Sequence, residues 1–188
     1  MGDVTYPRVD GVVFTHGAFQ KGDVLYLPRK GARKILVFKD WTFRRIEFRK
    51  RLDDERERLR REFDASRRAA YLRHLAEARR AELATAGLTD KDLSLMERGM
   101  VPPKYDVHHI LPLDDGGDNS FKNLILIRSR CEHSALSAYQ NSFTRGLGPG
   151  EVKTVDYPVP DAERRFAVYP PSSGLPTEVE LWPRRNTP

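Results

Sequence analysis

The sequence predicts an α+β fold, and three observations support that prediction. Residues 11–39 contain short apolar runs separated by Gly and Pro, which is typical of strands. Residues 41–86 contain neither Gly nor Pro, which favours helix. Residues 105–145 have the pattern strand, loop, strand, helix. We therefore expect a small β-rich segment, a helical region and a mixed core, in that order.

The N-terminal segment, residues 1–40, is expected to be β-rich or to act as a linker. Its three apolar runs are Val12–Phe14, Val24–Leu27 and Ile35–Phe38. Beyond the mixed core we expect two further strands, Val152–Tyr157 and Phe166–Tyr169. Residues 158–188 hold 7 of the 13 prolines, so residues 172–188 are predicted to form a Pro-rich, extended or disordered tail. The remaining residues, 41–171, would then form the main domain.

The helical region shows a regular apolar pattern. Its members recur at steps of 4, 7, 4 and 7, which places them on one helical face: Phe48, Leu52, Leu59, Phe63 and Ala70. We expect one long helix, or two with a break near residues 64–66, with this stripe packed in the core. Gly87 is expected to end the helix, and Thr89 to cap a short one that Gly99 ends.

Composition and charge exclude several classes of protein. No window approaches the roughly 18 consecutive apolar residues of a membrane span, so we expect no membrane partner. The single cysteine, Cys131, excludes an internal disulfide and a Cys-only zinc cluster. Residues 1–82 carry 21 basic and 13 acidic residues, net +8, whereas residues 83–188 carry 12 and 14, net −2. The basic part either contacts phosphates or presents a solvated helix face.

Three of the five histidines lie within 26 residues, at 108, 109 and 133. Neighbouring side chains on a strand point to opposite faces, so His108 and His109 are expected to diverge unless the strand ends or twists there. One could then face a metal while the other faces a substrate, and His133 could return to the metal from the following helix. Two imidazoles leave open coordination positions, as in a catalytic site. A closed zinc site would need about four ligands; Cys131 could be a third, but a fourth is not evident.

This segment resembles the HNH nucleases, which have the ββα-metal fold. The resemblance rests on His108-His-Ile-x-Pro-Leu, then Gly116-Gly, then Asn123-Leu, then His133, and it covers Val107 to about Tyr139. The expected fold is thus a ββα-metal core preceded by basic helices and a small N-terminal β-rich segment. The resemblance implies a phosphodiester hydrolase, most naturally a DNase.

A broader resemblance extends over roughly residues 41–171. It includes the run that begins at Pro102-Pro-x-Tyr, together with Leu136-Ser-x-Tyr-Gln, Gly148-Pro-Gly-Glu and Val168-Tyr-Pro-Pro. These stretches look like the C-terminal nuclease domains of type VI secretion effectors and S-type pyocins, relatives of the colicin DNases.

The resemblance also implies roles for individual residues. His109 would be the general base, and Asn123 would fix the loop that orients it. His108 and His133 would be metal ligands for one divalent ion: Mg, Mn, Ni or Zn. Colicin DNases carry a further histidine where this chain has Ser137. Four arginines are candidates for binding the substrate phosphate: Arg67, Arg68, Arg128 and Arg130.

Three functional hypotheses follow. The first is a toxic effector of interbacterial competition, with DNA as its substrate, a cognate acidic immunity protein, and a secretion carrier or upstream delivery domain. Because no Sec signal peptide is visible, such a protein would be cytoplasmic in the producer and would be delivered by another route into the target cytoplasm. The second is a phage or mobile-element HNH endonuclease. The third is a non-catalytic nucleic-acid-binding module.

Overall fold

A computed structural model describes residues 12–15, 18–28, 34–162, 164, 166–173 and 178–180. Its mixture of helices and strands agrees with the predicted α+β class. Across these described residues, the structure contains no helix long and apolar enough to cross a membrane.

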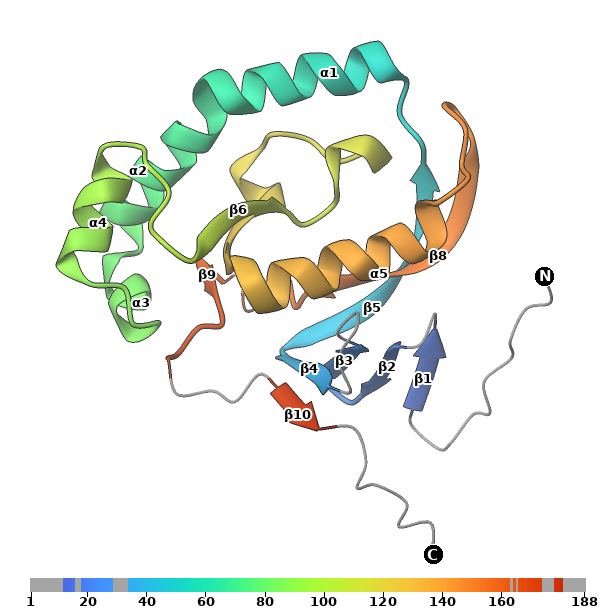
Figure 1. Ribbon diagram of the computed structural model, residues 1–188, viewed down its shortest axis with the longest axis horizontal. Helices are drawn as coiled ribbons and strands as arrows, with labels where there is room; N and C mark the ends of the chain where they lie inside the picture. Colours follow the sequence, from blue (N-terminus) through green and yellow to red (C-terminus); the bar gives the residue numbers. More distant parts are fainter. Residues whose placement is uncertain are drawn as a thin grey trace, which may run out of the picture.

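The N-terminal strands form an antiparallel meander (Figure 1). β1 (Val12–Thr15), β2 (Ala18–Lys21), β3 (Val24–Pro28) and β4 (Lys34–Lys39) lie side by side in chain order, which confirms the three predicted apolar strands. β10 (Glu178–Glu180) pairs with β4. Part of the expected tail is therefore a strand of this sheet; residues 174–177 and 181–188 lie outside the described residues.

The expected helix at the start of the 41–86 stretch is wrong. Residues Trp41–Arg49 form strand β5, which pairs antiparallel with β8 (Val152–Pro160) along its whole length. Trp, Thr, Phe and Ile dominate β5, and these residues favour strands when a partner is present. The partner lies about 110 residues away in sequence, so no local pattern could reveal it.

The helices begin after β5. They are α1 (Asp53–Glu62), η1 (Phe63–Arg67), α2 (Arg68–Ala78), α3 (Arg80–Thr85) and α4 (Asp90–Glu97). η1 is a π-helical turn at the predicted break, and it joins α1 to α2 without interrupting the helical path. Thr89 caps α4 in a capping box with Asp92, as its sequence predicts.

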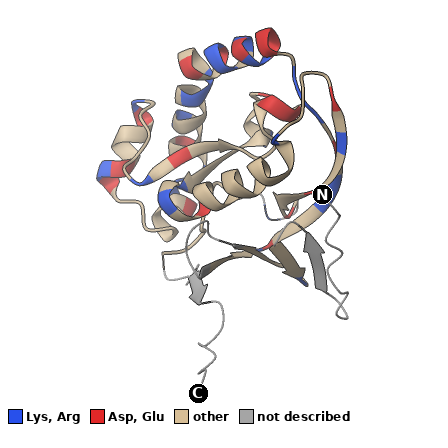
Figure 2. Cartoon of the chain, turned by 45° about the vertical axis from the view of Figure 1, so that its right-hand side comes forward, with Lys and Arg blue, Asp and Glu red and all other residues tan. Residues whose placement is uncertain are grey.

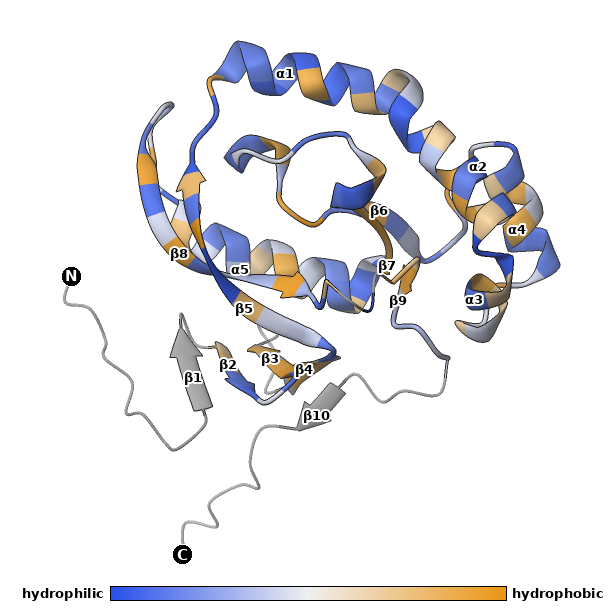
Figure 3. Ribbon diagram, turned by 180° about the vertical axis from the view of Figure 1, so that it is seen from behind, coloured by the Kyte–Doolittle hydropathy of each residue, from blue (hydrophilic) through white to orange (hydrophobic). Residues whose placement is uncertain are grey.

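The predicted apolar stripe is core only in part: Phe48 is fully buried, but it lies on strand β5 rather than on a helix, and the stripe members that follow it are not buried. α1 has no buried residue, and Leu52 is 54% exposed. Acidic and basic residues are interspersed along α1 (Figure 2), and most of its residues are hydrophilic (Figure 3). The buried positions lie instead in α2, where they include Tyr71, Leu72 and Leu75. α1 therefore contributes no buried side chain to the core.

The central sheet has strand order β6-β7-β9. β6 (Tyr105–His109) pairs antiparallel with β7 (Leu124–Arg128), and β9 (Val168–Tyr169) runs parallel to β7. A π-helical turn, η4 (Ser129–His133), and helix α5 (Ser134–Thr144) follow β7. The predicted order strand, loop, strand, helix is confirmed. The helix begins with a π-turn, and Ser129 lies inside that turn rather than capping it.

Strand β7 separates two hydrophobic cores. Ile125 and Ile127 belong to a core with α5, β5, β8 and strands β2 to β4. Leu124 and Leu126 belong to a second core with α2, α3 and α4. Because side chains alternate along a strand, one strand can complete both cores. Described residues of β2, β3 and β4 thus share a core with residues of β7 and α5.

The connection between β6 and β7 is held by its neighbours rather than by its own secondary structure. It contains two short 3₁₀ turns, η2 (Leu113–Asp115) and η3 (Phe121–Asn123). Arg51 donates from Nε to the Leu113 carbonyl and from Nη2 to the Gly117 carbonyl, both at 2.7 Å. A Cβ atom on Gly117 would lie 1.8 Å from the carbonyl oxygen of Leu111. Only glycine fits there.

We expect Gly117→Ala to destabilise the protein by about 3 kcal/mol, since the backbone of the connection must move. For a chain of this size that is a fall in Tm of roughly 6–12 °C. Gly148→Ala is the matched control, because its Cβ would make only ordinary contacts of 3.7 Å or more. Thermal unfolding followed by circular dichroism measures both, and equal Tm values would contradict the steric argument.

A second stability prediction concerns Asp115, which is buried. Its Oδ2 accepts a 2.7 Å hydrogen bond from Gln140, while Oδ1 has no hydrogen-bond partner. Burial raises the pKa of Asp115 from 3.8 to about 7. In the folded state Asp115 holds a proton that the unfolded chain releases near pH 4. The contribution of Asp115 to the free energy of unfolding therefore falls as the pH rises from about 4 to about 7.

Asp115→Asn removes this titration. The difference in Tm between the variant and the wild-type protein should therefore increase from pH 5 to pH 8. At pH 8 the variant should be more stable by about 2 kcal/mol. Differential scanning calorimetry across that range provides the test. A Tm difference that does not change with pH would show that Asp115 is ionised in the folded protein throughout.

Candidate active site

A cleft of about 390 Å³ lies between α1, β6 and α5. All three clustered histidines line it, together with residues of α1, η1 and η2. β6 is the edge strand of its sheet, so both of its faces can contribute to the same opening. Figure 1 shows α1 and α5 on opposite sides of β6. The fold thus gathers residues 60–64, 107–114 and 133–141 around one space.

His108 and His133 form one side of this cleft. His108 lies opposite Ile125 in the β6–β7 register, on the face that packs against α5. Its ring is 4.9 Å from the ring of His133, centroid to centroid. The Nδ1 atom of His133 lies 2.9 Å from Oδ2 of Asp106, two residues before His108 on the same face of β6. The two imidazoles therefore meet at the junction of β6 and η4.

His109 points to the other face. It lies opposite Leu124 in the register, and its ring packs 4.5 Å from the ring of Phe63 on η1. His109 is the last residue of β6, and the strand ends there. The two adjacent histidines thus diverge onto different faces, yet both reach the cleft at the strand's end.

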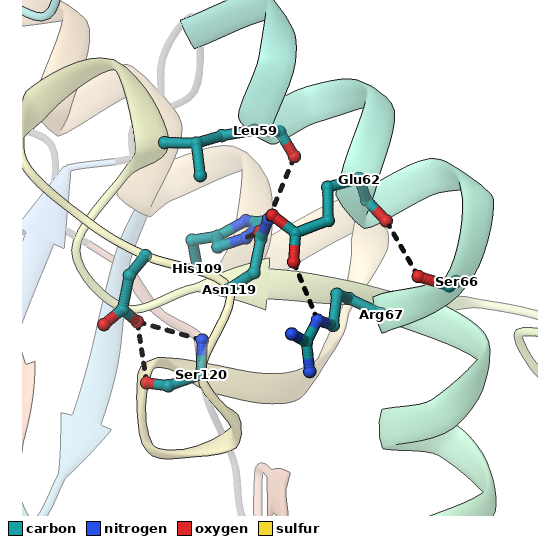
Figure 4. A network of polar contacts seen from close by, with 8 residues as sticks. Leu59, Glu62, Ser66, Arg67, His109, Asn119 and Ser120 are labelled. Atoms are coloured by element: carbon teal, nitrogen blue, oxygen red, sulfur yellow. Dashed lines mark hydrogen bonds and ion pairs between the residues drawn. The ribbon is translucent and has the colours of Figure 1, made fainter. Parts of the chain in front are cut away.

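Asn119 holds His109 in place (Figure 4). Its Oδ1 lies 3.0 Å from Nε2 of His109, and its Nδ2 donates to the Leu59 carbonyl at 3.0 Å and to Glu62 at 3.3 Å. Asn119 is buried, with 6% of its surface exposed. One side chain thus ties the end of β6 to α1.

This network fixes the tautomer of His109. A carbonyl oxygen can only accept, so the group facing Leu59 must be the amide NH₂ of Asn119, and the group facing His109 must be its oxygen. Nε2 of a neutral His109 therefore carries the proton, and Nδ1 carries the lone pair. Burial lowers the pKa of His109 below its ordinary value, and Arg60 acts in the same direction. The neutral form, with a basic Nδ1, is favoured at neutral pH.

Asn123 organises the backbone beside His109. Its Oδ1 accepts from the Leu111 amide at 2.8 Å, and its Nδ2 donates to the carbonyls of Leu111 and Asp118 at 2.8 and 2.9 Å. The Asn123 carbonyl also accepts from the Ile110 amide. Asn123 therefore holds the two ends of the β6–β7 connection together. Asn119, not Asn123, makes the side-chain contact with His109.

The four arginines expected at the phosphate lie outside the residues that line the cleft. Arg67 bonds Glu62, and Arg68 pairs with Asp64 and stacks over Phe63. Arg128 pairs with Glu132, a fully buried carboxylate that requires a cation. Arg130 is exposed. Arg60 is the arginine that lines the cleft, paired at 2.9 Å with Asp114.

The chemistry of His108 and His133 fits a divalent metal ion. Burial lowers the pKa of His108 to about 3, which keeps its imidazole neutral and able to bind a cation. Asp106 occupies Nδ1 of His133, which leaves Nε2 for an ion, as is usual for metal-bound histidine. Throughout the described ranges, no three or more His, Cys, Asp or Glu side chains are grouped to hold a metal. An ion here would complete its coordination with water or phosphate oxygens.

Sequence reasoning missed four residues of this site: Asn119, Asp106, Arg60 and Phe63. Asn119 and Asp106 lie within the motif, and the odd–even spacing of Asp106 and His108 could have placed both on one face. Arg60 and Phe63 come from a helix more than 40 residues earlier, and only the packing of that helix across β6 brings them near. Ser137, where colicin DNases have a histidine, does line the cleft.

Comparison with known proteins agrees with this geometry. Residues 98–137, which include β6, β7, η4 and the three histidines, match the model of the HNH endonuclease family. Over 117 residues the chain is 35% identical to the uncharacterized protein YhhZ of Escherichia coli (strain K12); the match covers 62% of this chain and 28% of that relative. No solved structure matches. The match of residues 98–137 to the HNH endonuclease family suggests nuclease activity.

Proposed function

We propose that this protein is a metal-dependent endonuclease that hydrolyses phosphodiester bonds of DNA. The observation that carries the proposal is the arrangement of the three histidines in one cleft. His109 lines the cleft with Nδ1 as its basic nitrogen, and His108 of β6 and His133 of η4 bring two imidazoles together on the opposite side of the strand. A base beside a two-histidine cation site is what hydrolysis of a phosphodiester requires.

His109 acts as the general base in this proposal. Its Nδ1 removes a proton from a water molecule, which attacks phosphorus in line with the leaving oxygen. Asn119 keeps Nε2 protonated and the ring oriented, and Phe63 limits the ring's contact with solvent. His108 and His133 would hold the metal, which supplies positive charge to stabilise the pentacoordinate phosphate. Arg60, which is paired with Asp114, would bind a phosphate oxygen of the substrate instead of that carboxylate.

DNA as the substrate is supported by the basic surplus of residues 1–82, which are net +8, whereas the rest of the chain is net −2. α1 and η1, which border the cleft, hold 5 arginines and 6 acidic residues, so the surplus lies in the segments before and after them. Much of this charge is compensated locally: Arg56, Arg61 and Arg68 each pair with an acidic residue on their own helix. Phosphates would therefore compete with carboxylates for these arginines, so binding should be salt-sensitive.

We also propose that the nuclease serves as a toxic effector in competition between bacteria. The sequence resemblance over residues 41–171 supports this role, which would require an acidic immunity protein and a delivery domain or carrier. An acidic inhibitor is chemically reasonable, because it would be attracted to the same basic surplus of residues 1–82 that DNA would use.

We expect plasmid cleavage to require Mg²⁺, Mn²⁺, Ni²⁺ or Zn²⁺ and to stop with EDTA. His109→Ala should lower kcat by at least about 100-fold, the typical contribution of a general base. Asn119→Ala should lower kcat by about 10-fold with a smaller change in KM, because it leaves the base present but less well oriented. Nicking of supercoiled plasmid, measured under single-turnover conditions, gives these rates.

Lys153→Ala is the matched control for this experiment, since Lys153 is exposed on β8 and lies outside the cleft. Far-UV circular dichroism and Tm of each variant confirm that it is folded. Cleavage by His109→Ala at the wild-type rate would contradict the assigned base. Wild-type protein that binds plasmid but never cleaves it with any of the four metals would favour a non-catalytic binding module.

Expression in the cytoplasm of Escherichia coli tests the toxic role. The wild-type chain, induced without a partner, should reduce viable counts and activate a DNA-damage reporter, whereas His109→Ala should do neither. Immunoblotting must show equal amounts of the two proteins. Normal growth with accumulation of active wild-type nuclease would argue against a toxin and would favour a phage or mobile-element enzyme.

A further inference from the structure

A second pocket of about 390 Å³ lies on the other side of the β6–β7 pair from His108. It is formed by β5, α2, η3 and the end of β8. Two exposed aromatic rings line it, His74 of α2 and Phe121 of η3, stacked with their centroids 5.2 Å apart and their planes 27° apart. We name it the aromatic pocket. Neither ring has a role in the active site.

Cationic side chains border the aromatic pocket. Arg44 of β5 and Lys122 of η3 are both exposed and line it, and Arg79 lines it while bonded to Glu82. The acidic lining residue is Asp161. Exposed aromatic faces next to basic side chains are the features with which proteins bind single-stranded nucleic acid, because bases stack on the rings and phosphates pair with the cations.

Two segments of the chain contribute residues to both the aromatic pocket and the active-site cleft. Ile110, which lines the aromatic pocket, follows His109 directly. The continuous path of α1, η1 and α2 passes both sites, with Phe63 in the cleft and His74 in the aromatic pocket. The 11 residues between them correspond to roughly 17 Å of helix, a distance that a strand of a few nucleotides can span.

We propose that the aromatic pocket is a second binding site, which holds an unpaired nucleotide of single-stranded DNA that extends from the cleft. A base stacks on the His74–Phe121 pair, and its phosphates contact Arg44 and Lys122. The inference rests on the proposed function, since it extends the path of the same substrate. A pocket of this size suits a small planar ligand.

The test measures binding without cleavage. Fluorescein-labelled dT12 is titrated with the full chain in EDTA and followed by anisotropy, so that the result does not depend on catalysis. The His74→Ala/Phe121→Ala variant should weaken dT12 binding by about 10-fold or more, because stacking contributes about 1–3 kcal/mol per base. Lys122→Ala should weaken it less, and Lys153→Ala should bind as wild type does.

A second measurement covers the case in which the double variant fails to fold. Phe121→Trp keeps an aromatic face, so it should retain dT12 affinity, and its fluorescence should be quenched on binding well beyond any change in the wild-type protein. The same variants should turn over bis(p-nitrophenyl) phosphate at the wild-type rate with Mn²⁺, since this small diester does not reach the aromatic pocket.

The outcomes separate the two proposals. Unchanged dT12 affinity in a folded double variant, or the absence of additional tryptophan quenching in Phe121→Trp, would overturn the aromatic-pocket assignment and leave the nuclease proposal intact. The assignment would also be overturned if oligoglutamate displaced labelled dT12 as well as unlabelled dT12 does, since the pocket would then bind any polyanion. Failure of the wild-type protein to hydrolyse the diester, with dT12 binding sensitive to Phe121, would count against the nuclease alone.

Discussion

The constraint on which the rest of the structure depends is the burial of β7 between two cores. Its four apolar residues alternate between the core of α5 and that of α2 to α4, so a register shift of one residue would exchange every side chain between the two. That register places His108 opposite Ile125 and His109 opposite Leu124. Adjacent side chains on a strand diverge in any register, so hydrophobic packing on the neighbouring strand decides which of the two histidines faces the α5 side.

Polar side chains then convert this scaffold into a site. Asn123 ties the two ends of the β6–β7 connection, Arg51 holds its middle, and Asn119 joins it to α1. Asn123 and Arg51 donate to backbone carbonyls of the connection itself, whereas Asn119 donates to the Leu59 carbonyl of α1. The same Asn119 side chain also determines which nitrogen of His109 is basic. Asn119 thus both ties the connection to α1 and determines the tautomer of His109.

The helical path from α1 to α2 has different roles at its two ends. α1 buries no residue, and its charged surface borders the cleft, whereas α2 packs through Leu72 and Leu75 into the second core. This explains why an apolar stripe read from the sequence was wrong as a core prediction in α1. Phe63 contacts the ring of His109, so part of the stripe serves the site rather than the core.

The sequence alone determined the α+β class, the strand–loop–strand–helix order, the cap at Thr89 and the three histidines of the site, because each depends on residues close together in the chain. Only the tertiary structure decided that residues 41–49 are a strand, since their partner is β8. It also decided that Asn119 contacts His109 and that Arg60 lines the cleft rather than Arg67 or Arg68. Which face a helical arginine presents depends on how the helix packs, and that packing is set by contacts with distant segments.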